Sequence, residues 1–351
     1  MNKAGQSLLL LTLVLSTPLM AGKSNMEVEI YGKLHASVDV VDDGENDNTN
    51  VSSNSSRIGF RGSKHLIRDL KGLWQLESTV VVDGESGSLD VRNRYVGING
   101  GIGTLLVGVH DTPFKSLARS VDIFNETIGD NRNLLGATAS DGNSKLFNVR
   151  ARNAIFYKSP KTNGIMFQAL YSTDYAGDDT VAEANRTLSS VSVTYDSGPL
   201  YLGVAYEDRW KNAGYRLLAR VKSETAFASF IFESLQSMHG VGGMPEDRNA
   251  YGFNAAYHIG LISLALQYIV TDKYEDTEDS GGNMVALGVF QSLSKSTRLY
   301  LVAANANNGT NAQFGLGGGG HGDPVLPYND PVTGRNDQDS TAISFGMIHK
   351  F

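Results

Sequence analysis

The sequence predicts an all-β fold, a 16-stranded antiparallel β-barrel that spans a membrane. Three observations predict it: long runs that alternate apolar and polar residues, breaks that alternate between short and long, and the composition. The 351 residues include 39 Gly, 15 Tyr and 14 Phe but no Cys, and 41% are hydrophobic. This composition is too apolar for a disordered chain and too polar for a bundle of membrane helices. Taken alone, it leaves a soluble β protein and a membrane barrel both open.

The amino-terminal segment has the features of a secretory signal peptide. Lys3 supplies positive charge, an apolar stretch runs from Leu8 to Leu15, and Ala21 lies at a site of small residues. The stretch is too short to span a bilayer as a helix, which takes about 20 residues. We therefore expect residues 1–21 to be a signal peptide and residues 22–351 to form a single barrel domain. Because the exported chain contains no Cys, disulfides do not hold its fold.

The alternating runs are long enough to cross a membrane. From Val28 to Val40, apolar or small residues alternate with polar residues without interruption. A tilted membrane strand needs about 9–11 residues, whereas a strand of a soluble sandwich has about 5–6. Sixteen such runs start near Val28, Ser53, Lys71, Leu89, Thr104, Arg150, Gly164, Leu188, Leu200, Tyr215, Ala226, Ala250, Leu261, Asn283, Ser296 and Thr341.

The breaks between the runs alternate in length. Short breaks include 100–103, 159–163, 197–199 and 259–261. Long breaks, rich in Asp, Asn, Gly and Ser, include 42–52, 112–149, 174–187, 237–249, 272–282 and 305–340. Short turns at one end and long polar loops at the other are typical of an outer-membrane barrel. Roughly 21 residues per strand suit a wide, water-filled barrel.

The break at 112–149 differs from the others because it contains many apolar residues. Phe114, Leu117 and Phe124 are among them, and they need a surface to pack against. Loops of this length are usually functional or disordered. We expect the segment to fold inward and narrow the lumen; a cap outside the barrel mouth is the alternative.

Several motifs, in order along the chain, resemble those of the Gram-negative general porin family, in particular its neisserial and β-proteobacterial branch. They lie at 31–34, 56–63, 70–77, 92–98, 103–105, 108–115, 122–130, 152–160 and 349–351. The resemblance implies a 16-stranded antiparallel transmembrane β-barrel with an inward-folded third loop, in which 112–149 is the constriction loop. It also implies a homotrimer in the outer membrane of a Gram-negative bacterium, through which small hydrophilic solutes and ions diffuse passively.

The resemblance further implies a constriction where basic residues on the wall face acidic residues on the loop. By position, Arg57, Arg92 and Arg152 match the wall, while Asp122 and Glu126 match the loop. Further candidates for pore lining are Arg94, Arg150, Asp130, Glu77 and His110. Opposed charges across a narrow gap create a transverse field that aligns dipolar solutes and penalises apolar ones.

Strand parity supports a lumen position for two of the arginines. Arg57 is out of phase with the apolar Ile58 and Phe60, and Arg92 alternates with Val91. An arginine that faces lipid at mid-bilayer costs about 2–4 kcal/mol. The alternative is that these arginines pair with surface carboxylates.

The net charge points to the ion preference. The chain has 30 Lys+Arg and 37 Asp+Glu, for a formal net charge of −7, with most of the acidic excess in the long loops. The family often has Arg where this chain has Val109, which weakens the basic wall. We therefore expect a weak cation preference.

The carboxyl-terminal Phe351 shares an apolar face with Phe345 and Met347. We expect this face to contact outer-membrane lipid as part of an aromatic girdle. The resemblance implies that Phe351 is also the signal read by the barrel-assembly machinery; an ordinary hydrophobic terminus is the alternative.

Other motifs carry no predicted site. Residues 42–47 lack the spaced ligands of a calcium loop, and the glycine-rich 317–321 lacks the ending of a phosphate loop, so we expect an external loop and a flexible tip. No metal-binding His pair or Ser-His-Asp grouping stands out, so we expect no metal, no cofactor and no enzyme. The acidic net charge argues against nucleic acid as a partner.

Three alternative functions remain open. One is a substrate-specific outer-membrane channel of the sugar or phosphate type, in which Tyr171, Tyr201 and Tyr300 form a binding track. Another is a barrel enzyme such as a lipase or protease, and the third is an adhesive surface protein that uses the long loops.

Overall fold

The computed structural model describes residues 26–84, 90–136, 147–175, 186–209, 212–237, 247–275, 277–317, 320–322, 325 and 338–351. The expected signal peptide, residues 1–21, lies outside the described residues. Within them, no helix has the length and apolar character needed to cross a membrane.

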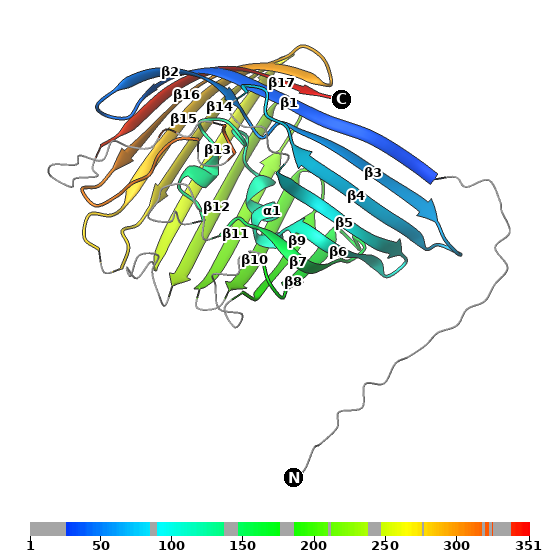
Figure 1. Cartoon of the computed structure of the whole chain (residues 1–351). Helices are drawn as coiled ribbons and strands as arrows, with labels where there is room; N and C mark the ends of the chain where they lie inside the picture. Colours follow the sequence, from blue (N-terminus) through cyan, green and yellow to red (C-terminus); the bar gives the residue numbers. More distant parts are fainter. Residues whose placement is uncertain are drawn as a thin grey trace, which may run out of the picture.

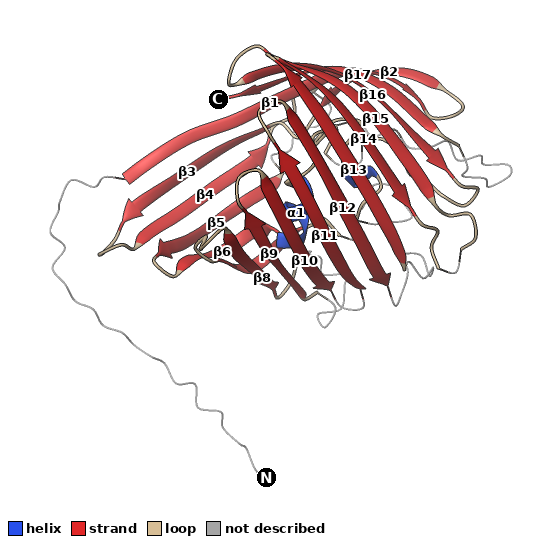
Figure 2. Cartoon of the chain, turned by 180° about the vertical axis from the view of Figure 1, so that it is seen from behind, coloured by secondary structure: helices blue, strands red, loops and turns tan. Residues whose placement is uncertain are grey.

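Seventeen antiparallel strands are described, and they close into one barrel (Figures 1 and 2). They are β1 (Met26–Asp42), β2 (Asp47–Ser53), β3 (Arg57–His65), β4 (Lys71–Thr79), β5 (Val91–Gly100), β6 (Gly103–Asp111), β7 (Arg150–Lys158), β8 (Ile165–Ser172), β9 (Leu188–Asp196), β10 (Leu200–Arg209), β11 (Asn212–Lys222), β12 (Ala226–Ser237), β13 (Arg248–Ile259), β14 (Ile262–Thr271), β15 (Gly282–Ser292), β16 (Thr297–Asn308) and β17 (Ser340–Lys350). The pairing of β17 with β1 closes the sheet.

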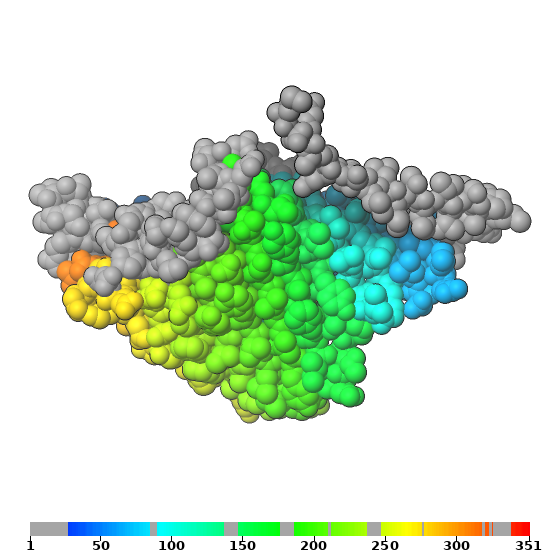
Figure 3. All heavy atoms as spheres, turned by 90° about the horizontal axis from the view of Figure 1, so that it is seen from below, coloured from blue at the N-terminus to red at the C-terminus, as the bar shows by residue number. Residues whose placement is uncertain are grey.

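The predicted 16-stranded barrel is confirmed, because two of the seventeen strands form one barrel strand. β2 pairs with residues 36–42 of β1, and β3 pairs with residues 26–33 of the same strand. A short break at residues 54–56 separates them. In space-filling view the middle strands, from β7 to β13, form a continuous outer surface (Figure 3).

One predicted long loop is wrong. The sequence predicts a break at 42–52, but residues 47–52 of it belong to β2, so that only a short turn remains. In this turn Asp42 Oδ1 accepts a hydrogen bond from the Gly44 N–H at 2.7 Å, and Asp43 Oδ1 accepts one from Asn46 at 2.8 Å. The strand was missed because polar residues, rather than alternating polar and apolar residues, make up six of its seven positions.

Burial follows the alternation along each strand, with the apolar face outward. In β1, Val38 is 47% exposed whereas Asp39 is fully buried, because polar side chains point into the lumen. This pattern is the inverse of a soluble protein and is what lipid around the barrel requires.

Phe351 completes the seam between the first and last strands. It exchanges two backbone hydrogen bonds with Gly32, at 2.9 and 3.1 Å. A Cβ on Gly32 would lie 2.3 Å from the Phe351 ring, so this close approach requires glycine. The ring is 53% exposed on the outer face, where the sequence predicts it. Its role as an assembly signal stays a prediction.

The segment after β6 lies inside the barrel, as predicted, rather than outside it. It contains α1 (Pro113–Arg119) and a 3-10 turn, η1 (Asn131–Asn133), and both views show α1 within the ring of strands (Figures 1 and 2). Thr112 caps α1 by accepting a hydrogen bond from the Lys115 N–H. We call the described residues 112–136 the inward loop; the end of the expected loop, 137–146, lies outside the described residues.

The apolar core lies between the inward loop and the inner faces of β10–β16. Its loop side consists of Phe114, Leu117, Ala118, Val121, Phe124, Ile128, Leu134 and Leu135, all of them buried. Close packing explains two wall glycines: a Cβ on Gly203 would lie 2.5 Å from Leu117, and one on Gly288 would lie 2.8 Å from Phe124. The inward loop therefore rests against one half of the barrel wall.

Candidate functional site

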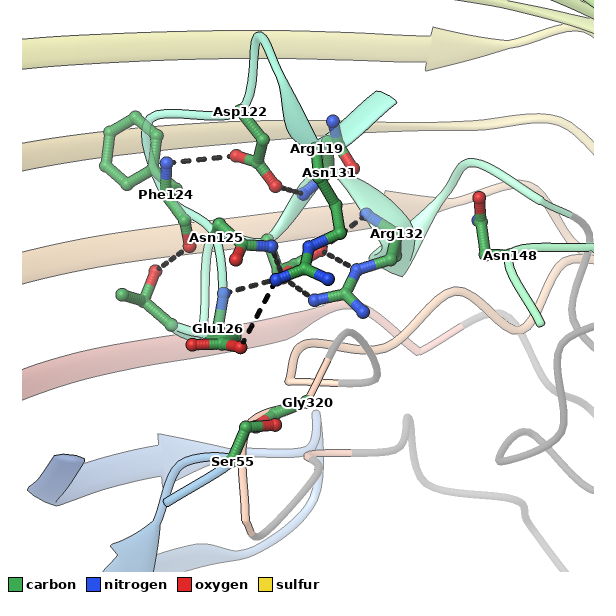
Figure 4. A network of polar contacts seen from close by, with 12 residues as sticks. Ser55, Arg119, Asp122, Phe124, Asn125, Glu126, Asn131, Arg132, Asn148 and Gly320 are labelled. Atoms are coloured by element: carbon green, nitrogen blue, oxygen red, sulfur yellow. Dashed lines mark hydrogen bonds and ion pairs between the residues drawn. The ribbon is translucent and has the colours of Figure 1, made fainter. Parts of the chain in front are cut away.

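The inward loop presents a polar side to the opposite wall, formed by β1 and β3–β7. Glu126 lies at its tip and reaches across the lumen (Figure 4). Its Oε1 accepts a hydrogen bond from Arg57 Nη1 at 2.9 Å, and its Oε2 forms an ion pair with Lys33. Arg119, from α1, approaches the same carboxylate at 3.9 Å. Three cations from three elements therefore surround one acidic group.

The backbone at Glu126 is strained, and the loop itself supports it. Its φ angle is +65°, in the left-handed region, where a non-glycine residue costs on the order of 1–3 kcal/mol. Asp130 Oδ2 accepts a hydrogen bond from the Glu126 N–H at 2.6 Å, which holds this conformation. Arg132 in turn clamps Asp130 through Nε at 2.9 Å. The unfavourable backbone conformation at Glu126 therefore directs its carboxylate toward the wall.

Glu126 is negatively charged at neutral pH. Burial raises the pKa of this carboxyl, but the charges of Lys33 and Arg57 outweigh burial, so that its pKa lies below its usual range. Asp122 differs: burial and the nearby Asp130 raise its pKa well above its usual range. Of these two loop carboxylates, Glu126 is the one that reliably contributes negative charge.

Two wall carboxylates are each shared among several cations. Glu77 Oε1 accepts a hydrogen bond from Arg92 at 2.7 Å, and its Oε2 lies 4.0 Å from Arg57. Asp111, at the end of β6, binds Lys115, Arg119 and Arg150 at 2.9, 3.0 and 3.2 Å, in that order. These groups form a continuous chain of ion pairs with Glu126.

We call this chain the charged cluster. Its basic members are Lys33, Arg57, Arg92, Lys115, Arg119 and Arg150, and its acidic members are Glu77, Asp111 and Glu126. Six cations against three carboxylates leave an excess of positive charge. The cluster lies across the lumen at the level of the inward loop, where it can act on any charged solute that passes.

The structure brings together five of the residues that the sequence singled out: Arg57, Arg92, Arg150, Glu77 and Glu126. Two acidic candidates build the loop instead of facing the wall. Asp122 accepts hydrogen bonds from the Phe124 and Asn131 N–H groups at 2.9 and 3.1 Å. Asp130, fully buried, caps η1 and holds Glu126.

Arg94 lies on the outer face of the barrel, although it stands only two residues from Arg92. The pairing of β4 with β5 shifts between Leu76 and Ser78, because β5 contains an extra residue there. Arg94 therefore stands opposite Leu76, which is 55% exposed, and donates to Ser78 Oγ at 2.6 Å. Val109 pairs with Arg94, so its lack of charge does not weaken the lumen wall.

Two other candidates lie apart from the charged cluster. Arg152 lies at an irregularity of β7, is exposed, and forms no ion pair within the part of the chain that the structure describes. His110 packs flat on Phe156, with ring centroids 4.2 Å apart.

Four members of the charged cluster were not predicted from the sequence: Lys33, Arg119, Lys115 and Asp111. The position of Lys33 on the polar face of β1 is a signal that could have found it.

The tyrosines of the sugar-track alternative do not lie together. Tyr171 is exposed on the outer face, and Tyr300 is buried with its ring over Gly346. Tyr201 lies on the inner wall, 4.5 Å from the Arg220 guanidinium.

Comparisons with known proteins agree with this architecture. A family model described as Gram-negative porin matches residues 7–311. Outer membrane porin protein 32 of Delftia acidovorans is 27% identical over 319 residues, which cover 85% of each chain. Major outer membrane protein P.IB of Neisseria sicca is 28% identical over 261 residues, 69% of this chain and 67% of that one.

A solved structure shares the fold. The anion-selective porin from Comamonas acidovorans has a TM-score of 0.76 at 24% identity, covering 93% of this chain and all of that one. The family match, the closed barrel and the named relatives also place the chain in the outer membrane, as predicted. Since the family model covers most of the sequence, the chain belongs to the Gram-negative porin family.

Proposed function

We propose that the chain is a general diffusion porin, a water-filled channel for passive transport of small hydrophilic solutes and ions across the outer membrane. The observation that carries this proposal is the inward loop, which narrows a closed barrel and faces a charged wall. Residues 112–149 then act as the constriction loop of a single barrel domain, 22–351, after removal of the signal peptide, 1–21. The lipid-exposed apolar face fits outer-membrane lipid.

The charge balance supports an anion preference in place of the weak cation preference expected from the net charge. That expectation rested on acidic residues in the long loops, whose influence falls off over about 8 Å at physiological salt. The charged cluster acts at the narrow zone, where six cations outnumber three carboxylates. The Comamonas porin, whose barrel resembles this one, is described as anion-selective.

Planar-bilayer recording tests both statements. A general porin gives stepwise, ohmic openings. In a gradient of potassium chloride, an anion preference should move the reversal potential toward the equilibrium potential of chloride. A silent bilayer would refute the channel, whereas openings with a potassium-directed reversal potential would refute only the anion preference.

The outer face of β4–β6 supports a homotrimer. Arg94 is half-buried there among apolar neighbours such as Leu76 and Val96. An arginine facing lipid at mid-bilayer costs about 2–4 kcal/mol, and a second protomer covering this face would remove that cost. Conductance steps in threes are expected. Arg94→Glu should weaken the oligomer on unheated gels, whereas Leu217→Ala, on the outer face of β11, should not; an unchanged Arg94→Glu oligomer would contradict this interface.

The substrate-specific channel is less well supported, because Tyr171 and Tyr300 do not line the lumen with Tyr201. Of these three tyrosines, Tyr201 beside Arg220 alone is left to contact a solute, and one residue does not make a sugar track. Conductance that saturates at low solute concentration would favour this alternative over general diffusion.

A further inference from the structure

Residues 314–317 and 320–322, described parts of the segment between β16 and β17, also lie inside the barrel. The sequence predicts a flexible tip at 317–321, and residues 318 and 319 of it lie outside the described residues. Gly317 and His321 are buried, and so are Phe314 and Leu316 before them. We call residues 320–322 the second tip. In Figure 4, Gly320 lies beside Ser55, on the wall across from Glu126.

The second tip occupies a notch in the barrel wall. The notch is the break at residues 54–56, where β2 ends and β3 has not begun. Ser56 Oγ keeps β1 bonded across the break, accepting from the His35 N–H at 2.9 Å and donating to the His35 carbonyl at 3.0 Å. The side chains of Asn54 and Ser55, the other two residues of the break, can therefore bind a segment other than β1.

The backbone of the second tip uses those groups. Ser55 Oγ donates to the Gly320 carbonyl at 2.9 Å, and the Gly322 N–H donates to Asn54 Oδ1 at 2.8 Å. Glycine is required at both positions. A Cβ on Gly322 would lie 2.5 Å from the Ser53 carbonyl oxygen, and one on Gly320 would lie 2.6 Å from Ser55 Oγ.

His321 provides a third contact with the same wall. Its Nε2 lies 3.0 Å from Asp39 Oδ2, and both side chains are almost completely buried. Asp39 also accepts hydrogen bonds from Ser37 and Ser52, at 3.0 and 2.6 Å. Three consecutive residues of the second tip therefore each have a polar partner on β1 or in the notch.

The second tip also meets the inward loop. A Cβ on Gly320 would lie 3.5 Å from Arg132 Nη2 and 3.6 Å from Glu126 Cγ, which are ordinary contact distances. Glu126 itself is paired with Lys33 and Arg57 on the wall. The region of the lumen between β1, the notch and the inward loop is therefore filled from both sides.

We propose that the second tip is a second constriction element, which closes the lumen beside β1 and confines solutes to the passage along β4–β7. The inference rests on the proposed channel function. His321 and the two glycines become determinants of pore size, although neither the charge pattern nor the inward loop includes them. Glu77, Arg92, Asp111 and Arg150 border the passage that remains.

A single added methyl group tests the proposal. In Gly322→Ala the new Cβ would collide with the Ser53 backbone, so the second tip must leave the notch. Single-channel conductance should rise on the order of twofold, because conduction follows the open cross-section. The matched control is Gly72→Ala, whose Cβ would have no neighbour closer than 3.6 Å and should conduct like the wild type. A Gly322→Ala barrel with wild-type conductance would overturn the proposal.

Thiol accessibility gives an independent test, also if Gly322→Ala fails to fold. The chain contains no Cys, so Asn54→Cys supplies the only thiol, at a notch position that is completely buried next to Gly322. We expect a bulky, water-soluble thiol reagent to leave the folded Asn54→Cys barrel unmodified and its current unchanged, and to modify the same chain after unfolding. Modification of the folded barrel with a fall in current would show that the second tip normally lies elsewhere. A wild-type barrel without conductance would refute the channel function instead.

Discussion

The inward loop makes two unlike contacts with the barrel, and the difference separates anchoring from transport. Toward β10–β16 it buries Phe114, Phe124 and other apolar side chains away from water. Toward β1 and β3–β7 it presents Glu126, which forms ion pairs with Lys33 and Arg57 on the wall. The apolar contact can fix the position of the loop without closing the lumen, whereas the charged contact leaves polar surface along the path of a solute.

The anchored side is also tied by polar groups that solutes do not reach. Arg216 and Glu233 form an ion pair whose side chains are both completely buried. Arg216 donates to the Phe114 carbonyl at 2.8 Å, and Glu233 accepts from the Gly136 N–H at 2.7 Å, so the pair holds both described ends of the loop. Other wall side chains donate to loop carbonyls in the same way: Arg220 to Ser120, Ser229 to Val121, Gln267 to Gly129 and Arg248 to Leu134.

The largest change in stability and conductance is expected from a substitution at the contact between the inward loop and β10–β16. Arg216→Met leaves Glu233 buried without its cation, and removing one partner of a buried ion pair costs about 3–5 kcal/mol. We expect a lower thermal transition and a larger, noisier conductance, because the loop loses its position. The control is Arg61→Met, which removes an exposed pair with Glu29 and should leave both readouts near wild type. Wild-type stability and conductance in Arg216→Met would contradict the anchoring role.

The next effect concerns the charged side. Glu126→Gln leaves Lys33 and Arg57 without their shared carboxylate, so the anion preference should increase, with a stability loss of about 1–3 kcal/mol. Glu126→Gly removes the same charge but suits the positive φ angle, so it should shift selectivity equally while losing less stability. Reversal potentials and thermal melting separate the two quantities. Unchanged selectivity in both variants would remove Glu126 from the constriction.

A smaller effect distinguishes two arginines that the sequence treats alike. Arg57→Ala should reduce the anion preference, because Arg57 belongs to the charged cluster. Arg152→Ala should change it less, because Arg152 is exposed and lies outside the cluster. The two reversal potentials, measured in the same salt gradient, test the assignment. A larger shift for Arg152 would mean that the narrow zone lies elsewhere along β7.

The smallest effect is expected from pH. The pKa of Glu126 in the folded chain lies below its ordinary value of 4.5, so the stability from its ion pairs is fully present above that value. It is lost only as pH falls through the lower, folded pKa. Between neutral pH and about pH 5 the contribution of Glu126 to selectivity should therefore stay constant. A large change in Glu126-dependent selectivity over this range, absent from Glu126→Gln, would contradict the ion pairs.

Much of the barrel could be predicted because strand alternation is a local property. The alternation from Val28 to Val40 predicts which residues face outward, and the exposed side chains of β1 agree with it. The break at 54–56 could not be predicted, because it depends on Ser56 replacing part of the ladder of hydrogen bonds. β2 could not be predicted either, because polar residues lie on both of its faces and its sequence does not alternate between apolar and polar residues.

The site was predicted less completely, because register irregularities and side-chain reach are not local. Simple alternation places Arg92 and Arg94 on one face, yet the extra residue in β5 separates them. Asp122 and Glu126 look equivalent in sequence, but only Glu126 projects toward the wall, because Asp130 supports its unusual backbone. The glycines near His321 predicted flexibility, whereas their function in the fold is close approach to Ser53 and Ser55.

The central claim is that the polar side of the inward loop borders the conducting path. The absence of Cys allows a direct measurement, the current through Arg119→Cys barrels before and after addition of a bulky, water-soluble thiol reagent. Arg119 projects from the loop into the charged cluster and remains partly exposed. We predict a stepwise fall in conductance on modification, with no change for Glu275→Cys in an outer loop. Modified Arg119→Cys barrels that conduct as before would contradict the claim.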